Sequence, residues 1–177
     1  MPPRLEPAAT STLETAAEAR RDPRFAVGDR VRVRNVETPG HTPGHMCLYE
    51  PEAKVFFSGD HILDSITPNI SGWGPEPDPL GDFLASLSKV AAYDIRLVLP
   101  GHRNPIRGHR RRIEELKAHH EIRTQEVADI LARAEQTAYQ VAAQMTWDMT
   151  YPTWDMFPVS QKWFATGEAI AHLKYLE

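Results

Sequence analysis

The sequence of 177 residues lacks three features that would assign it to common classes of protein. It has a single cysteine, Cys47, so no disulfide can form within the chain. No apolar run approaches the roughly 18 residues that a membrane-spanning helix needs, and the first residues carry no apolar signal segment. The formal net charge is −4, so a strongly basic nucleic-acid-binding surface is not expected. These absences predict a soluble, cytoplasmic protein that binds neither membrane nor nucleic acid.

What is present indicates a folded chain with an α/β region. Hydrophobic residues make up 41% of the sequence, which is enough for a buried core. After a polar leader over residues 1–24, alternating apolar and charged residues predict a strand over 25–37. Two further strands are expected over 45–50 and 54–60, joined by a hairpin turn. A helix over 82–93, with Asp82 as its N-cap, and a buried strand over 95–102 follow. Strand, helix and strand in this order predict an α/β sheet.

The last third of the chain has the spacing of helices. Apolar residues from Ile113 to Met145 recur every three or four positions, which predicts one long helix or two helices with a break near residues 134–137. A final amphipathic helix is expected to end near Glu177. The sequence therefore divides into a leader (1–24), an α/β region (25–112) and a helical region (113–177).

Three polar residues stand where predicted strands end, each directly after a glycine. They are His41, Asp60 and His102. Glycine allows the backbone to turn sharply, and ligands of open α/β sheets bind at the carboxyl ends of strands. Two imidazoles and a carboxylate at one sheet edge form a reasonable site for a divalent metal ion.

Each of these residues also has an ordinary structural interpretation. A single histidine in a Pro-Gly loop is more often part of a turn, and a single aspartate after Ser-Gly usually caps a turn or a helix. The occurrence of all three residues, each after a glycine at a strand end, is stronger evidence for a metal site than any one of them alone. Among the other candidates, His61, His120 and Cys47 are expected to pack in the core. The basic stretch over 102–112 either contacts phosphates or, more commonly, begins a solvated helix.

The stretches TPGHTPGHMCLYE, FFSGDHIL and LVLPGH, in this order, resemble the metallo-β-lactamase-fold hydrolases. The resemblance implies an αββα sandwich with one or two metal ions between its sheets, most often zinc, with iron or manganese as alternatives. It implies that His41 binds one ion, that His102 binds the second, and that Asp60 bridges them and orients the attacking water. His45 would support His41. Trp73, in the long loop over 66–81, would either contact the substrate or anchor the loop on the core, and the sequence favours neither interpretation over the other.

One part of the family pattern is absent. The motif His-x-His-x-Asp-His, which supplies most of the metal ligands, does not occur, and all eight histidines lie at or after His41. The chain therefore looks like the C-terminal half of such an enzyme, followed by a winged-helix-like helical tail. We expect a metal-dependent hydrolase of an ester, thioester, lactam or phosphodiester that is incomplete as this chain. The alternative is a non-catalytic fragment or interaction module. Its partners would be a small-molecule substrate and, through an uncovered sheet face, a second copy or another chain.

Overall fold

The computed structural model describes residues 28, 30–148 and 150–177, so the predicted leader over 1–24 lies outside the described residues. The first part of the described chain has three strands, a helix and a fourth strand, and helices alone follow. The elements are β1 (Arg34–Glu37), β2 (Met46–Glu50), β3 (Val55–Gly59), α2 (Pro79–Ala91), β4 (Leu97–Pro100), α3 (His109–Leu131), α4 (Ala138–Ala142), the 3-10 helix η1 (Trp154–Met156) and α5 (Val159–Leu176).

The strands form one sheet in the order β1-β2-β3-β4. β1 pairs antiparallel with β2, and β2 pairs antiparallel with β3, as the hairpin prediction requires. β4 pairs parallel with β3, because α2 carries the chain back to the starting edge of the sheet. The predicted α/β class and the strand–helix–strand order are confirmed.

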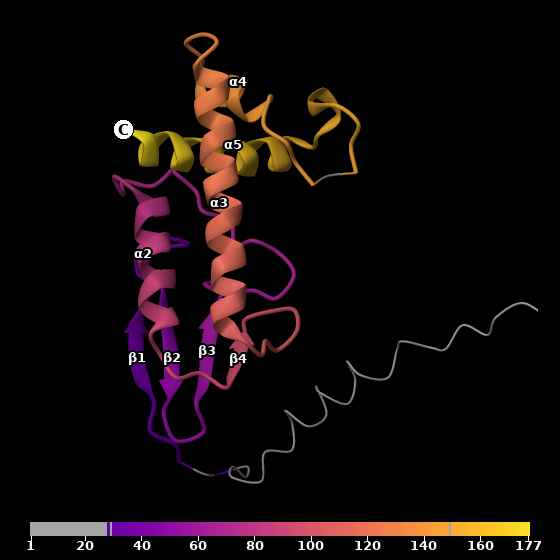
Figure 1. The fold of residues 1–177 in the computed structure, drawn as a ribbon. Coiled ribbons are helices and arrows are strands. Elements are labelled where there is room, and N and C mark those ends of the chain that lie inside the picture. Colours follow the sequence, from indigo (N-terminus) through magenta and orange to yellow (C-terminus); the bar gives the residue numbers. More distant parts are fainter. Residues whose placement is uncertain (1–27, 29, 149) are drawn as a thin grey trace, which may run out of the picture.

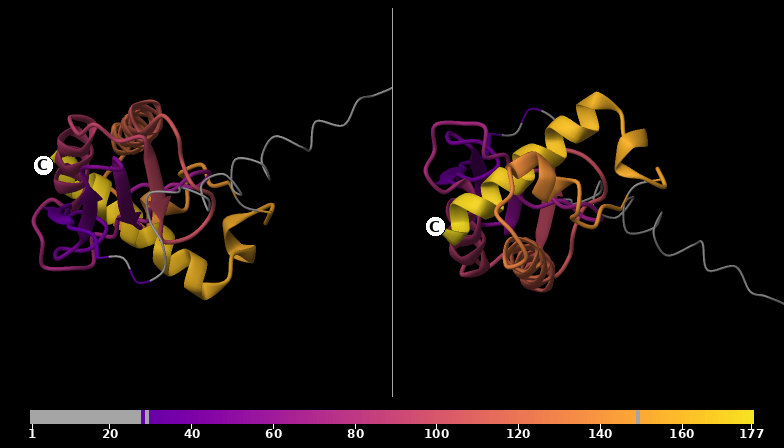
Figure 2. Two further views of the ribbon diagram at one scale, coloured as in Figure 1. Left: turned by 90° about the horizontal axis from the view of Figure 1, so that it is seen from below. Right: turned by 90° about the horizontal axis from the view of Figure 1, so that it is seen from above.

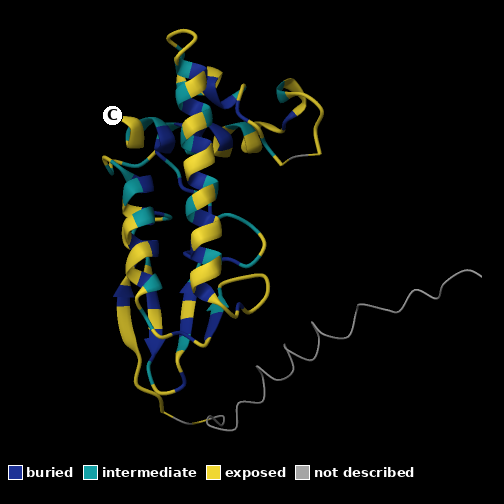
Figure 3. Cartoon of the chain, viewed as in Figure 1, coloured by how far each residue is buried: buried dark blue, intermediate teal, exposed yellow. Residues whose placement is uncertain are grey.

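Helices α2 and α3 cover one face of the sheet (Figures 1 and 2). The main core lies between the sheet and these two helices. There Phe56 and Val98 of the sheet pack with Phe83 of α2 and Leu116 of α3, and each of these residues is at most 1% exposed. The opposite face carries Met46, Leu48 and Phe57, whose side chains are 54%, 39% and 42% exposed. Leu48 and Phe57 are direct cross-strand neighbours, so these exposed apolar side chains lie side by side. Figure 3 shows that the strands carry both buried and exposed positions.

A second core cluster holds the helical region together. Of the two alternatives, one long helix or two helices, the second is confirmed, since α3 ends at Leu131 and α4 begins at Ala138. Thr137 and Gln140 form a capping box at the start of α4. The far end of α3 then packs with α4 and α5 through Val127, Ile130, Val141, Ala142, Met145 and Ala169. α5 runs past one end of α2 and crosses α3 within its length (Figure 1). In the described part of the chain, no helix has the length and apolar character needed to cross a membrane.

Two predicted boundaries are wrong. α2 begins at Pro79, and its N-cap is Asp78 and not Asp82, because Asp78 Oδ1 accepts a hydrogen bond from the Gly81 amide at 2.7 Å. Proline suits the first helical position, where its missing N–H has no partner to lose. The strand predicted over 25–37 is also shorter in the described residues. Pairing starts at Arg34, opposite Tyr49, and β2 ends one residue later at Glu50, so residues before Val33 have no β2 residue opposite them.

Candidate functional site

The three predicted ligand residues meet at one edge of the sheet. β1 and β3 both run antiparallel to β2, and β4 runs parallel to β3, so the carboxyl ends of β1, β3 and β4 share an edge. Asp60 follows β3 directly, and its Oδ1 lies 3.2 Å from His102 Nε2 after β4. Its Oδ2 lies 3.8 Å from His41 Nε2 in the loop after β1. Each carboxylate oxygen therefore faces a different imidazole.

A glycine allows the β3 and β4 ends to approach so closely. The Gly101 amide donates a hydrogen bond to the Gly59 carbonyl at 2.8 Å. A Cβ at Gly101 would lie 2.8 Å from Asp60 Oδ1 and 3.3 Å from the carbonyl carbon of Gly59. Any side chain at this position would displace the Asp60 carboxylate, so the glycine before His102 is required by the geometry of Asp60.

The two histidines of TPGHTPGH have different surroundings. His41 Nδ1 lies 2.8 Å from the Asn69 carbonyl oxygen, which can only accept a hydrogen bond. Nδ1 therefore carries the proton, and Nε2 of a neutral His41 presents its lone pair on the side of Asp60. His45 Nδ1 instead lies 2.8 Å from the Thr38 hydroxyl. Burial lowers the pKa of His45, and the neighbouring His41 lowers it further.

The donor atoms fit one side of a divalent-metal centre. Two ligand atoms of one tetrahedral zinc ion, each at about 2.0–2.1 Å, lie about 3.3 Å apart. The His102–Asp60 distance of 3.2 Å agrees with this value, and the His41–Asp60 distance of 3.8 Å is somewhat longer. The set is not complete, because no three His, Cys, Asp or Glu residues of the described chain are arranged to hold one ion. The described residues would offer each of two ions one imidazole nitrogen and one carboxylate oxygen.

Trp73 belongs to the loop between β3 and α2, and this loop packs against α5. Its ring stacks on Trp163 of α5, with centroids 5.7 Å apart and planes 13° apart, and its Nε1 donates a hydrogen bond to the Trp163 carbonyl at 3.2 Å. Trp73 is 46% exposed and Trp163 is 52% exposed, so much of the pair faces solvent. The same loop supplies Asn69 to His41. Sequence reasoning missed Trp163, because no spacing pattern relates it to Trp73, 90 residues earlier.

The remaining candidates lie outside this group of three residues. His61, Cys47 and His120 are at most 1% exposed, which confirms that they pack in the core. Burial lowers the pKa of His61 to about 3, and its ring packs edge-on against Phe83. In the basic stretch, Arg112 donates hydrogen bonds to the carbonyls of Leu63 and Ile66, so it holds the loop after β3 against α3.

Known proteins match the segment that carries these residues. A sequence model of the Metallo-beta-lactamase superfamily matches residues 18–102, which include His41, Asp60 and His102. Lactamase-like protein nscB of Neosartorya fischeri is 34% identical over 109 residues, which are 62% of this chain and 31% of that protein. Probable metallo-hydrolase YqjP of Bacillus subtilis is 30% identical over 115 residues, covering 62% of this chain and 36% of its own length.

Two crystal structures share the fold over most of this chain. A beta-lactamase domain protein from Burkholderia ambifaria aligns with a TM-score of 0.74 and 35% identity, covering 86% of this chain and 46% of that one. A metallo-beta-lactamase family protein from Thermus thermophilus aligns with a TM-score of 0.70 and 35% identity, covering 82% and 44%. The chain thus spans about a third of the length of the curated relatives and less than half of the solved structures. Residues 18–102 therefore match the metallo-beta-lactamase superfamily in sequence, and the described chain shares the fold of solved proteins of that kind.

Proposed function

We propose that this chain carries one side of the catalytic centre of a divalent-metal-dependent hydrolase. The observation that supports this proposal is the position of Asp60, whose two oxygens face two different imidazoles. In this proposal His41 and His102 would each hold one ion, and Asp60 would contribute one carboxylate oxygen to each. Zinc is the preferred ion for imidazole and carboxylate ligands, with iron or manganese as alternatives. A bound ion of this kind would lower the pKa of water toward about 7 and polarise the oxygen of the target group.

The residues around the ions have separate roles in this proposal. The Asn69 carbonyl holds the proton of His41 on Nδ1, which keeps Nε2 free to bind metal. Asp60 would also accept a hydrogen bond from the attacking water and so orient it toward the substrate. Because a catalytic zinc site usually has about three protein ligands, each ion needs at least one ligand more than these residues give.

We propose that the additional ligands come from a polypeptide surface that covers the exposed face of the sheet. Met46, Leu48 and Phe57 form a contiguous apolar surface there. A surface packed on them would bury that apolar area and bring its own side chains to the sheet edge beside Asp60. A second copy of this chain and a separate chain are the two candidate sources.

The substrate proposed here is a small molecule with an ester, thioester, lactam or phosphodiester group. A relative from Aspergillus fumigatus, Atrochrysone carboxyl ACP thioesterase, is 30% identical over 83 residues, which favours a thioester, although the match covers only 24% of that protein. Trp73 is the proposed substrate contact, because its loop reaches the site through Asn69 and its stacked ring is partly exposed.

The alternative function is a non-catalytic interaction module. It is favoured by the lack of a three-ligand group in the described residues and by the exposed apolar sheet face. The two functions differ in whether metal binds at Asp60, because an interaction module needs only the sheet face.

Zinc titration of the untagged protein, followed by calorimetry and by metal analysis, separates the two functions. The hydrolase proposal expects zinc binding that Asp60→Asn, His41→Ala and His102→Ala each abolish. His119→Ala is the matched control, since it removes an imidazole on α3 away from the sheet edge and should leave binding unchanged. Zinc retained below about one tenth of an equivalent would refute metal binding by this chain alone. Hydrolysis of a chromogenic thioester by the zinc-loaded protein, lost in Asp60→Asn, tests the chemistry.

A further inference from the structure

The loop that fixes the proton of His41 is itself held against α5. The Asn69 carbonyl accepts the hydrogen bond from His41 Nδ1. Three residues later, the Gly72 amide donates a hydrogen bond to the Gly167 carbonyl of α5 at 2.8 Å. The short segment from Asn69 to Gly72 therefore joins a proposed metal ligand to the last helix of the chain.

Gly72 lies so close to α5 that no side chain fits between them. A Cβ at Gly72 would lie 2.5 Å from Ile170 Cγ2 and 2.7 Å from the Ala171 amide nitrogen. The Ile170 side chain can turn to another rotamer, but the Ala171 nitrogen belongs to the backbone of the helix. An ordinary contact of a Cβ is at least 3.4 Å long, so the loop and the helix would have to separate by about 0.7 Å.

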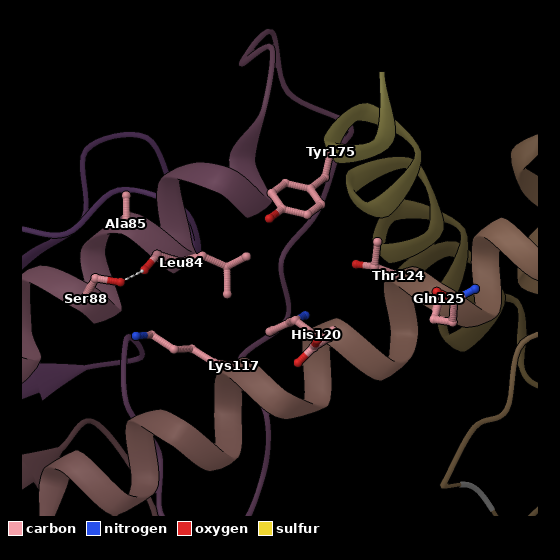
Figure 4. A pocket seen from close by; sticks show the side chains of 9 residues that line it. Leu84, Ala85, Ser88, Lys117, His120, Thr124, Gln125 and Tyr175 are labelled. Atoms are coloured by element: carbon pink, nitrogen blue, oxygen red, sulfur yellow. Dashed lines mark hydrogen bonds between the residues drawn. The ribbon is translucent and has the colours of Figure 1, made fainter.

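The helix is the part that stays in place. Ala169 packs in the second core cluster and Ala171 packs in the main core, so both cores hold the middle of α5. Open space lies farther along the helix, where Tyr175 lines a cavity of about 550 Å³ together with Leu84 of α2 and Thr124 of α3 (Figure 4). A side chain at position 72 would therefore displace the loop and not the helix.

A displaced Gly72 would weaken the hydrogen bond to His41. Two residues separate Gly72 from Asn69, so a shift of the loop reaches the Asn69 peptide unless the buried side chain of Ile70 absorbs it. A shift of about 0.7 Å would lengthen the distance from His41 Nδ1 to the Asn69 oxygen from 2.8 Å to about 3.5 Å, where little of a hydrogen bond is left. His41 Nε2, 3.8 Å from Asp60 Oδ2, would then gain more by carrying the proton and donating it to that carboxylate.

We propose that Gly72 is a positioning residue for His41, because it lets the loop rest on α5 and so holds the Asn69 carbonyl at His41 Nδ1. This role rests on the proposed function, since the place of the proton matters to the chemistry once Nε2 binds a metal ion. It gives α5, in the helical region, a part in building the proposed metal site at the edge of the sheet.

Long-range proton–nitrogen NMR correlations report which ring nitrogen of each histidine carries the proton. They are recorded on the metal-free full chain at about pH 8, above the usual pKa of imidazole. His41 of the wild type should be the Nδ1–H tautomer, and Gly72→Ala should move most of its population to the Nε2–H tautomer. Gly74→Ala is the matched control from the same loop and should change nothing, because the atoms nearest to a Cβ at Gly74 belong to the Glu76 carboxyl group, which can turn away.

Two further measurements separate positioning from folding. His172 Nδ1 donates to the Glu168 carbonyl within α5 at 2.9 Å, so an unchanged His172 tautomer shows that α5 stays folded in a variant. Gly167→Ala is a milder second variant, because the atoms nearest to its Cβ belong to side chains of the loop and not to the backbone. It should shift the His41 tautomer in the same direction to a smaller extent, and it decides the question if Gly72→Ala does not fold.

In the zinc titration, Gly72→Ala should weaken binding about 10-fold, and Gly74→Ala should leave it unchanged. An unchanged His41 tautomer in the folded variants would overturn the proposal, because the buried part of the loop would then hold Asn69 by itself. A changed His172 tautomer in both variants would also overturn it, because Gly72 would then serve the whole fold. A wild type that binds no zinc would refute the proposed hydrolase, whereas the His41 tautomers would still decide the role of Gly72.

Discussion

Replacement of Gly40 by alanine should destabilise the protein, whereas replacement of Gly44 should not, although the two glycines have the same neighbours in the sequence. Both follow proline and precede histidine in TPGHTPGH. Gly40 has φ +133°, and a Cβ on it would lie 2.4 Å from Phe83 Cβ and 2.5 Å from Phe83 Cα. The positive φ costs a β-carbon-bearing residue about 1–2 kcal/mol, and overpacking against the backbone of α2 adds about 1–3 kcal/mol. The expected loss in the free energy of unfolding is therefore about 2–5 kcal/mol.

Urea unfolding followed by circular dichroism measures this loss, with Gly44→Ala as the matched control. A Cβ at Gly44 would meet no atom within 4 Å, so that variant should stay within about 0.5 kcal/mol of the wild type. The reasoning is refuted if the two variants unfold at the same urea concentration. Because Gly40 directly precedes His41, Gly40→Ala should also weaken zinc binding in the titration proposed above.

The other predictions concern buried groups. Cys47 is fully buried with a pKa raised to about 11 by burial, so Ellman's reagent should detect no thiol in the native protein and one thiol after unfolding in guanidinium. Burial lowers the pKa of His120 to about 3 and that of His172 to about 4, whereas the unfolded chain binds these protons below about 6.5. The free energy of unfolding should therefore fall as pH drops from about 6.5 toward 4, and His172→Phe should make this slope shallower; equal slopes would contradict the assignment. Arg123→Met should cost about 3–5 kcal/mol, because the arginine side chain is 7% exposed and its loss leaves two carboxylates unpaired. Arg111→Met, at an ion pair whose arginine is 88% exposed, should cost at most about 1 kcal/mol.

Local sequence patterns predicted most elements of the fold because each depends on neighbours along the chain. The hairpin turn between two apolar segments identified β2 and β3, and spacing of three or four identified α3, α4 and α5. The end of a strand depends on its partner, so the pattern over 25–37 could not show that pairing begins at Arg34. The start of α2 was misplaced because two aspartates, Asp78 and Asp82, both suit an N-cap, and only backbone geometry chooses between them.

The identities of the candidate site residues could be read from the sequence alone, since His41, Asp60 and His102 each follow a glycine at a strand end. Their arrangement could not. Only the parallel course of β3 and β4 brings Asp60 within 3.2 Å of His102, and only the Asn69 carbonyl sets the proton position on His41. The stacking of Trp73 on Trp163 and the close contact of Gly72 with α5 likewise emerged only from the folded chain. These features join residues far apart in the sequence, where no periodic pattern records which side chains will meet.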